Sequence, residues 1–547
     1  MRLLIGVCLI LTINVLDANY PGLPEITKGS IWPQPVEVEY KKEALPFNPS
    51  KLNLTYTNGA CSLFNLAFKN YDKNFFFPIH AKGKEDRSLV LNVNIKKNCP
   101  KDREFPTDNM DESYSLTIGL DRIAHIEANE VWGALRGLES FSQVIIYNNE
   151  RDTYEIRTLI VKDKPRFKIR GFLIDTSRHY LSVNLIKRQL DLMAINKYNI
   201  LHWHIVDEQS FPYVSKKFPQ LSNKGAYSKR HVYKASDVTS VMMHAKMRGI
   251  MVMPEFDTPG HMGSWYGQPD LLTECFDEKG KKIELPFPNL IDPSNPENFK
   301  FLFNFFSEVK SLFKSTLMHL GGDEVEFWQK YCWFNNPKIQ KFMLDKGFGN
   351  ETKLLENYYI SQLSSTVATV DKNWKQLYWQ EVFDFSKVPQ NSIVHIWKGG
   401  NLSEIYDTMA RVTQEGYDVI LSSCWYLNYV HYGPDWRVKK RTRNTEGIAL
   451  YECDPQGFNG TQSQKDRVIG GIAALWGEFI DASNLEPVSW PRGSAVAEKL
   501  WSPRQFTVDA AAQLPRLREH RCRMVERGFN AAPFDGADFC ENELLIR

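Results

Sequence analysis

The feature that most constrains the fold is a rhythm of short apolar segments that begins after Pro165. Each segment ends in polar or aromatic residues and is followed by a helix-like stretch. Eight such segments occur, at residues 168–175, 199–206, 250–255, 316–321, 376–381, 392–397, 418–423 and 471–476. Amphipathic stretches at 185–193, 235–247 and 299–313 lie between them. Eight strand–helix units predict a (β/α)8 barrel, with a doubly wound parallel sheet as the alternative.

The residues before Pro165 follow a different pattern. Alternating apolar residues predict strands at 36–40, 89–95 and 114–118, and a helix with one apolar face is predicted at 129–142. We therefore expect an α+β support domain at residues 19–165. The catalytic barrel, with a C-terminal extension, is then expected at 166–547.

The N-terminus indicates the secretory pathway. Arg2 is followed by an apolar run at 3–13 that Asn14 and Asp17 interrupt, which is typical of a signal peptide at residues 1–18, cleaved near Ala18. The run is too short to span a bilayer, and no later uninterrupted apolar stretch is long enough. We expect a soluble mature chain in the lysosome or outside the cell, with no membrane span.

The cysteines and the glycosylation sequons fit the same compartment. Eight cysteines follow the signal peptide, without CxxC spacing or clustered histidines, so a zinc site is not expected. An even number in an oxidising compartment predicts disulfides between sequence neighbours: Cys61–Cys99, Cys275–Cys332, Cys424–Cys453 and Cys522–Cys540. Sequons predict glycosylation at Asn53, Asn350, Asn401 and Asn459.

Charge and composition exclude some partners. The chain has 67 Lys and Arg against 65 Asp and Glu, a net charge of +2, with no long run of one sign. This gives no electrostatic footprint for nucleic acid or an anionic membrane. Aromatic residues make up 13% of the chain and include 14 Trp, whose flat faces suit sugars, although a large core would explain them equally well.

The chemistry is expected at the carboxyl ends of the strands, where barrel enzymes place their catalytic groups. Carboxylates ringed by Trp, with no metal-ligand set, predict glycoside hydrolysis by a carboxyl that protonates the leaving oxygen, and no metal or other cofactor. The adjacent acids Asp323 and Glu324 cannot point the same way, so we expect different roles for them; the alternative is an acidic pair at a helix N-terminus. The candidate residues at the eight ends are Arg178, Asp207, Glu208, Glu255, Asp257, His261, Asp323, Glu324, Trp379, Glu381, Trp397, Trp425, Tyr426, Trp476 and Glu478.

Several of these motifs resemble the family 20 glycoside hydrolases, among them the lysosomal β-N-acetylhexosaminidase α and β subunits. The motifs extend over nearly the whole mature chain and stand in the family's order. They are His-Leu-Gly-Gly-Asp-Glu (319–324), Arg-Gly-Phe-Leu-Ile-Asp-Thr-Ser-Arg-His (170–179), Leu-His-Trp-His-Ile-Val-Asp (201–207), Pro-Glu-Phe-Asp-Thr-Pro-Gly-His (254–261), Trp-Gly-Glu (476–478) and Arg-Cys-Arg-Met-Val-Glu-Arg-Gly (521–528).

The resemblance implies an exo-acting enzyme that removes terminal β-linked GlcNAc or GalNAc with retention, by attack of the substrate's own acetamido oxygen. Glu324 would be the general acid and then the base that activates water. Asp323 would orient the acetamido N–H, and Tyr426 would donate its hydroxyl to the acetamido oxygen. The resemblance also implies a homodimer and an oligosaccharide or glycoconjugate as substrate.

Other roles carried over from the family concern the walls and the support of the site. The resemblance implies a relay of Asp207 and His261 behind the acid, so we expect the pKa of Glu324 to lie above that of a free glutamate. Glu255, Asp257 and Glu381 are expected to support the site without touching substrate. Expected to contact the sugar are Trp379, Trp397 and Trp476 as walls, and Arg178 and Glu478 as partners of the hydroxyls at the non-reducing end.

The sequence departs from the family pattern at three places. Glu208 stands where the vertebrate enzymes have Asp. In the segment 425–429, Asn428 resembles the α subunit, which accepts anionic substrates, but Tyr429 replaces the Arg that follows there; we therefore expect good activity on neutral substrates and weak activity on 6-sulfated ones. The Cys424–Cys453 pair is absent from the vertebrate subunits and rests on cysteine parity alone.

Two other functions are weighed against this one. An endo-chitinase-like barrel uses the same acetamido chemistry, but it needs an Asp-x-x-Asp-x-Asp-x-Glu motif where this chain has Gly-Gly-Asp-Glu. A catalytically silent sugar-binding protein should have lost Glu324 or Tyr426, and both are present. The sequence leaves open which natural substrate is preferred, whether N-glycan, glycolipid or chitin fragment.

Overall fold

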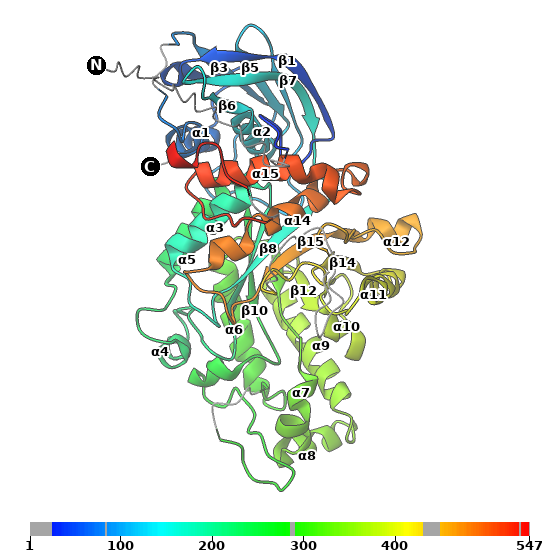
Figure 1. Ribbon diagram of the computed structural model, residues 1–547. Coiled ribbons are helices and arrows are strands. Elements are labelled where there is room, and N and C mark those ends of the chain that lie inside the picture. The colour runs from blue at the N-terminus through cyan, green and yellow to red at the C-terminus, as the bar shows by residue number, and fades with distance from the viewer. Residues whose placement is uncertain (1–24, 82–84, 285–289, 430–448, 535–537, 546–547) are drawn as a thin grey trace, which may run out of the picture.

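The structure is a computed structural model of the 547-residue chain and describes residues 25–81, 85–284, 290–429, 449–534 and 538–545 (Figure 1). The predicted signal peptide at 1–18 lies outside the described residues. Two parts are visible: a small mixed sheet with helices on one face, and a larger barrel. The mixed α/β architecture with a barrel in the C-terminal part confirms the predicted fold class.

Eight parallel strands close the barrel, and the doubly wound alternative is excluded because β15 pairs with β8. Each predicted strand segment overlaps one strand of the ring. The interior side chains alternate along each strand with those that face the helices. The strands are β8 (Ile169–Asp175), β9 (Ile200–Val206), β10 (Met251–Phe256), β11 (Leu317–His319), β12 (Lys375–Trp379), β13 (Ile393–Ile396), β14 (Asp418–Leu421) and β15 (Val468–Leu475).

The connections are less regular than the strands. A typical outer helix is α6, which starts where the Asn295 side chain accepts the Glu297 N–H and Pro296 fills the first turn. The connecting elements are α3 (Val183–Ile195), α4 (Gln220–Gly225), α5 (Ala235–Lys246), η2 (Gly263–Gly267), α6 (Pro296–Leu312), α7 (Glu326–Trp328), η3 (Gln329–Phe334), α8 (Pro337–Asp345), α9 (Thr352–Val370), α10 (Gln380–Phe385), α11 (Leu402–Gln414) and α12 (Gln462–Asp466). After the barrel come α13 (Leu485–Ser489), α14 (Arg492–Trp501), η4 (Arg504–Phe506), α15 (Ala510–Glu526) and η5 (Glu543–Leu545).

The small sheet has the order β1-β7-β4-β5-β3-β2, with β6 also paired to β7. Helices α1 (Ser62–Asn74) and α2 (Val131–Gln143) lie on the side of the sheet that faces the barrel (Figure 1). Every residue of α2 is buried, because the helix is covered by the sheet on one side and the barrel on the other. The strands are β1 (Glu37–Phe47), β2 (Leu52–Tyr56), β3 (Leu89–Ile95), β4 (Tyr114–Ile118), β5 (Ile123–Ala128), β6 (Ile145–Asn148) and β7 (Thr153–Asp163), with η1 (Pro49–Lys51) before β2.

Helix α15 joins the two parts and lies between them in Figure 1. Arg527, the residue that follows α15, pairs with Glu139 of α2 at 3.1 Å, and His520 of α15 contacts Asn196 at the end of α3 at 2.9 Å. Both contacts are buried, where removing one partner would leave the other unsatisfied. The helix therefore fixes the small sheet against the end of the barrel at which the strands begin.

Four disulfides join sequence-adjacent cysteines, as expected: Cys61–Cys99, Cys275–Cys332, Cys424–Cys453 and Cys522–Cys540. Among the described residues, no helix has the length and apolar character needed to cross a bilayer. The sequon residues Asn53, Asn350 and Asn459 are exposed, and Asn401 is partly exposed.

Candidate active site

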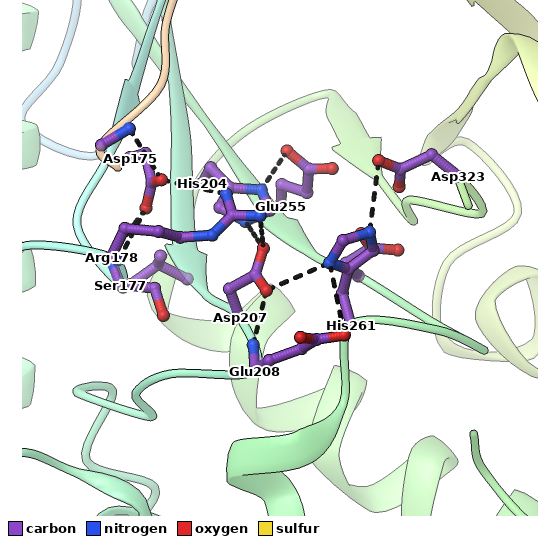
Figure 2. A network of polar contacts seen from close by, with 12 residues as sticks. Asp175, Ser177, Arg178, His204, Asp207, Glu208, Glu255, His261 and Asp323 are labelled. Atoms are coloured by element: carbon purple, nitrogen blue, oxygen red, sulfur yellow. Dashed lines mark hydrogen bonds and ion pairs between the residues drawn. The ribbon is translucent and has the colours of Figure 1, made fainter. Parts of the chain in front are cut away.

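The loops that follow β8, β9, β10 and β11 bring five of the predicted residues into one network (Figure 2). His261 is the centre of this network. Its Nδ1 lies 3.1 Å from Asp207, and its Nε2 lies 3.6 Å from Asp323 and 3.5 Å from Glu324. Arg178 joins from the other side through Asp207 at 2.9 Å. The strand-end rule thus identified side chains that do meet in space.

The backbone around the acidic pair is unusual. Glu324 and His261 both have φ of 54°, in the left-handed region that side chains rarely adopt. Gly321 and Gly322, which precede the pair, have φ of 72° and 98°. A Cβ on Gly321 would lie 1.6 Å from Asp257 Oδ1, so only glycine fits beside that carboxyl. The turn before Asp323 and Glu324 therefore requires the two glycines.

Asp207 contacts three nitrogen-bearing side chains. Its Oδ2 lies 2.9 Å from the Arg178 guanidinium and 2.7 Å from His204 Nε2, and its Oδ1 faces His261. The Glu208 backbone N–H also donates to Oδ1. Burial raises the pKa of Asp207, but the charges of Arg178 and His261 and the His204 contact outweigh burial and hold the pKa well below its usual value. Asp207 is therefore a fixed anion.

The pKa of Glu324 corrects the sequence-based expectation. The hydrogen bond with His261 and the positive charge of that ring lower the pKa of Glu324 below its usual value, although burial raises it. Burial lowers the pKa of His261, but the carboxylates of Asp207 and Asp323 outweigh this and raise it well above normal. His261 thus places a positive charge beside Glu324, which explains why the shift is downward.

Asp323 is paired with a second acid that the sequence placed in a supporting role. Asp257 Oδ2 and Asp323 Oδ1 are buried and have no donor among the described residues. Asp257 Oδ1 accepts the Gly322 N–H at 2.9 Å. Burial and the charge of Asp323 raise the pKa of Asp257 well above normal. A neutral Asp257 that donates its proton to Asp323 satisfies both carboxyls.

Aromatic side chains surround one side of the acids. Trp476 lies 5.8 Å from Trp379 and 6.5 Å from Tyr426 between ring centroids. Tyr426 is stacked on Trp397 at 6.1 Å and on Tyr429 at 5.7 Å. Burial raises the pKa of Tyr426 well above normal, so its hydroxyl is a neutral donor. The three predicted Trp walls and the predicted Tyr donor therefore form one continuous aromatic surface.

Two further acids in the site have raised pKa values. Burial and the charge of Asp323 raise the pKa of Glu381 to about 7, against the opposing charge of Lys398. Glu381 accepts the Trp397 indole N–H at 2.7 Å, so it orients a wall residue, and Lys398 lies 2.8 Å away. Burial also raises the pKa of Glu208 to about 7, against the charge of His261.

The remaining predicted residues lie around this centre. Glu478 is exposed, and its charge acts on Arg178 and on the Tyr429 hydroxyl. Asn428 has a buried amide oxygen without a donor among the described residues. Trp425 does not face the site, because its fully buried indole donates to the Leu450 carbonyl at 2.9 Å.

Two groups of side chains come close enough to resemble metal sites, with ligand-type atoms within 4.8 Å of one another. They are His202 with Glu255 and His319, and Asp257 with His261 and Asp323. In the first group, N–H donors already occupy both oxygens of Glu255. In the second group, a proton that Asp257 donates to Asp323 accounts for the closeness of these two carboxyls. Hydrogen bonding explains both arrangements, and we assign neither as a metal site.

Sequence reasoning missed the histidines below the site. His202 and His204 point into the barrel and both contact Glu255, which was expected only to support the site. A signal was present in the His-Trp-His triplet, since alternation along a strand puts both histidines on one face. Asp175 was also missed; it accepts from Arg178 at 3.0 Å and from the Gly477 N–H at 2.9 Å.

Comparison with known proteins gives a consistent result. Residues 167–504 match the model of glycosyl hydrolase family 20, catalytic domain, and residues 31–144 match a model described as beta-acetyl hexosaminidase like. The chain is 44% identical to beta-hexosaminidase A of Caenorhabditis elegans, covering 99% of this chain and 98% of the relative. It is 43% identical to the human beta-hexosaminidase subunit beta, with 97% and 94% covered. The solved chitobiase of Flavobacterium johnsoniae aligns with a TM-score of 0.74 at 27% identity, over 91% of this chain and 73% of that one.

Proposed function

The chain belongs to glycosyl hydrolase family 20, and we propose that it is an exo-acting β-N-acetylhexosaminidase. It removes terminal, non-reducing β-linked GlcNAc or GalNAc from glycoconjugates or chitooligosaccharides, with retention. The observation that carries the proposal is the pairing of two adjacent acids with different partners. Glu324 faces the His261 ring, while Asp323 is buried beside Asp257 and the aromatic surface.

Glu324 performs both proton transfers. In the first step it gives its proton to the glycosidic oxygen as the bond to C1 breaks, and the acetamido carbonyl oxygen of the same sugar bonds to C1. The resulting oxazolinium ion is then opened by water, whose proton returns to the Glu324 carboxylate. The two transfers require a carboxyl of moderate acidity that can lose its proton and regain it. A partly exposed carboxyl beside an imidazolium meets this requirement.

Asp323 and Tyr426 hold the acetamido group for this attack. The Asp323 carboxylate accepts the acetamido N–H and offsets the positive charge that develops on the ring. Tyr426 donates its hydroxyl to the acetamido oxygen. The acetamido oxygen is then held at the reacting carbon in the orientation for attack. In well-aligned systems such positioning lowers the activation free energy by about 7 kcal/mol or more.

The exo specificity follows from the residues that bind the far end of the sugar. Arg178 and Glu478 bind the hydroxyls at the non-reducing end, and Arg178 is held in place by Asp175 and Asp207. Such fixed charges leave no room for a further sugar residue on those hydroxyls. Trp379, Trp397 and Trp476 contact the acetamido methyl and the sugar face.

Substrate charge is selected at Asn428 and Tyr429. Tyr429 is 58% exposed and carries no charge that would attract a 6-sulfate. The enzyme therefore prefers neutral substrates to sulfated ones.

The protein acts in the lysosome or outside the cell, carries N-glycans and forms a homodimer. The four disulfides and the exposed sequon residues support an oxidising, lumenal compartment. Sequencing the mature N-terminus tests entry into the secretory pathway, glycopeptide mass spectrometry tests the N-glycans, and the solution mass of the purified protein tests the dimer. A monomeric mass at micromolar concentration would contradict the dimer.

The activity is tested by hydrolysis of a neutral aryl β-N-acetylglucosaminide between pH 3.5 and 7.5. We expect an acidic optimum and, in Glu324→Gln, a loss of about three orders of magnitude in kcat. Glu326→Gln is the matched control, because this acid lies two residues away, at the start of α7, and contacts Lys398. A folded wild type without activity would favour the sugar-binding alternative, and a fully active Glu324→Gln would refute the role of Glu324.

A further inference from the structure

The centre of the barrel holds an unusual number of polar side chains. Barrel interiors are mainly filled by branched apolar residues. Here Glu255 of β10 is completely buried and receives contacts from His202, His204 and His319 and from the Trp379 indole. His395 of β13 continues the chain from His319 at 3.2 Å and reaches Ser422 at 2.7 Å. These contacts lie below the acids of the site, and the proposed mechanism does not use them.

Two of these histidines are nearly equivalent in position but differ in one contact. His202 and His204 are both on β9, both buried, and both 2.8 Å from the same oxygen, Glu255 Oε2. The second nitrogen of His204 lies 2.7 Å from Asp207 Oδ2. The second nitrogen of His202 has no hydrogen-bond partner among the described residues. His204 alone of the two bridges a pair of carboxylates (Figure 2).

The bridge ends on the residue that organises the catalytic site. Asp207 Oδ2 is shared by His204 and Arg178, and its Oδ1 faces His261. An aspartate has two rotatable bonds, so its plane is set by the donors on both oxygens. Without His204, Oδ2 of Asp207 would lose a buried 2.7 Å contact.

We infer that His204 is a positioning residue, an imidazolium that bridges Glu255 to Asp207 and so fixes the carboxylate on which His261 and Arg178 depend. The inference rests on the proposed function, since it assigns Asp207 to the support of the acid Glu324. It adds a charged residue in the barrel interior to the residues that organise the site.

The charges around the ring support an imidazolium. Burial lowers the pKa of His204, but Glu255 and Asp207 on either side outweigh it and raise the pKa well above normal. Burial lowers the pKa of His202 to about 4, which the single contact with Glu255 does not reverse. The other groups that act on this region are Arg178 and Asp175 from the loop and end of β8, His319 from β11, and the Trp476 ring, 4.9 Å from His204. Arg178, His204 and His261 thus face the carboxylates of Asp175, Asp207 and Glu255, and His261 also faces Asp323 and Glu324.

The first test compares His204→Gln with His202→Gln in the pH profile of kcat/KM on a neutral aryl substrate. Removing the cation beside Asp207 raises the pKa of that carboxyl. In an acid titration the variant therefore protonates Asp207, and loses activity, at a higher pH than the wild type does. We expect His204→Gln to move the acid limb up by about one pH unit and to lower kcat/KM about tenfold. His202→Gln removes a contact to the same Glu255 oxygen and should leave the acid limb in place. Equal effects of the two variants, or no shift in either, would overturn the inference.

A second measurement needs no variant. Neutron diffraction on wild-type crystals near pD 7 should show deuterium on both ring nitrogens of His204 and on one nitrogen of His202. A singly deuterated His204 would overturn the inference even if His204→Gln fails to fold. Absence of hexosaminidase activity in the wild type would overturn the proposed function by itself, because the neutron result is independent of turnover.

Discussion

The imidazole Nε2 of His261 lies 3.5 Å from Oε2 of Glu324, and both residues have a left-handed backbone with φ of 54°. Such conformations cost about 1–3 kcal/mol each and persist where the surroundings fix them. Here the turns after β10 and β11 fix both, and the strain places the cation beside the acid. The contact between the His261 imidazole and the Glu324 carboxyl therefore lowers the pKa of Glu324.

The His261 charge should determine the alkaline limb of activity. A cation beside Glu324 lowers its pKa, so the acid loses its proton at a lower pH than a free glutamate would. In His261→Gln the pKa of Glu324 rises, and the protonated acid persists to higher pH. We expect the alkaline limb of kcat/KM to move up by about one pH unit, while the maximum falls.

The control for this variant is His231→Gln, which removes an exposed histidine that contacts Ser228. Its profile should superimpose on the wild type. An alkaline limb of His261→Gln that stays fixed or moves down would show that the ring does not carry a charge in the working enzyme.

Asp257 and Asp323 offer a second matched pair. If Asp257 is neutral and donates to Asp323, then Asp257→Asn keeps the donor and should change kcat/KM by no more than about fivefold. Asp323→Asn replaces the anion that we propose accepts the acetamido N–H and should lower kcat about a hundredfold or more. Steady-state kinetics on one neutral substrate separates them. Comparable losses in both variants would mean that Asp257 works as an anion.

The sequence was most informative where backbone geometry restricts residue choice. The eight apolar segments each overlap a barrel strand, and the Gly-Gly turn before Asp323 follows from a position where a Cβ would collide with Asp257. Helix α1 in the small part was not predicted, although its buried residues follow helical spacing, and neither were strands β2, β5, β6 and β7. Long-range pairing, not local preference, decides where such elements form.

The charge states were less accessible to sequence. The predicted direction of the Glu324 pKa shift was wrong. The shift depends on which neighbour is nearest, and the effect of the His261 ring outweighs that of burial. The two histidines of β9 could have been placed inside the barrel by alternation. Their opposite pKa shifts could not, since these depend on which of the two rings contacts Asp207, three residues after His204.

Tyr429 should decide between neutral and sulfated substrates. Its ring is stacked on Tyr426, and its hydroxyl lies close enough to Glu478 and Glu324 for their charges to act on it. We expect Tyr429→Arg to raise the ratio of kcat/KM for a 6-sulfated over a neutral aryl substrate by roughly three- to tenfold, the scale of a partly exposed ion pair. Tyr429→Leu removes the ring without adding charge and should leave the ratio unchanged. Comparable kcat/KM of the wild type on both substrates would contradict the selection proposed here.

The Cys424–Cys453 disulfide should support both stability and turnover, because Cys424 lies two residues before Tyr426. Replacing both cysteines by Ser removes a cross-link that spans 29 residues and should cost about 3 kcal/mol of unfolding free energy. It should also lower kcat, since Tyr426 then holds the acetamido oxygen less firmly. The control is Cys61→Ser with Cys99→Ser, a cross-link of 38 residues in the small sheet part, which should lower Tm similarly but leave kcat unchanged. If both double variants lose Tm and keep kcat, the Cys424–Cys453 bond stabilises the fold without positioning Tyr426.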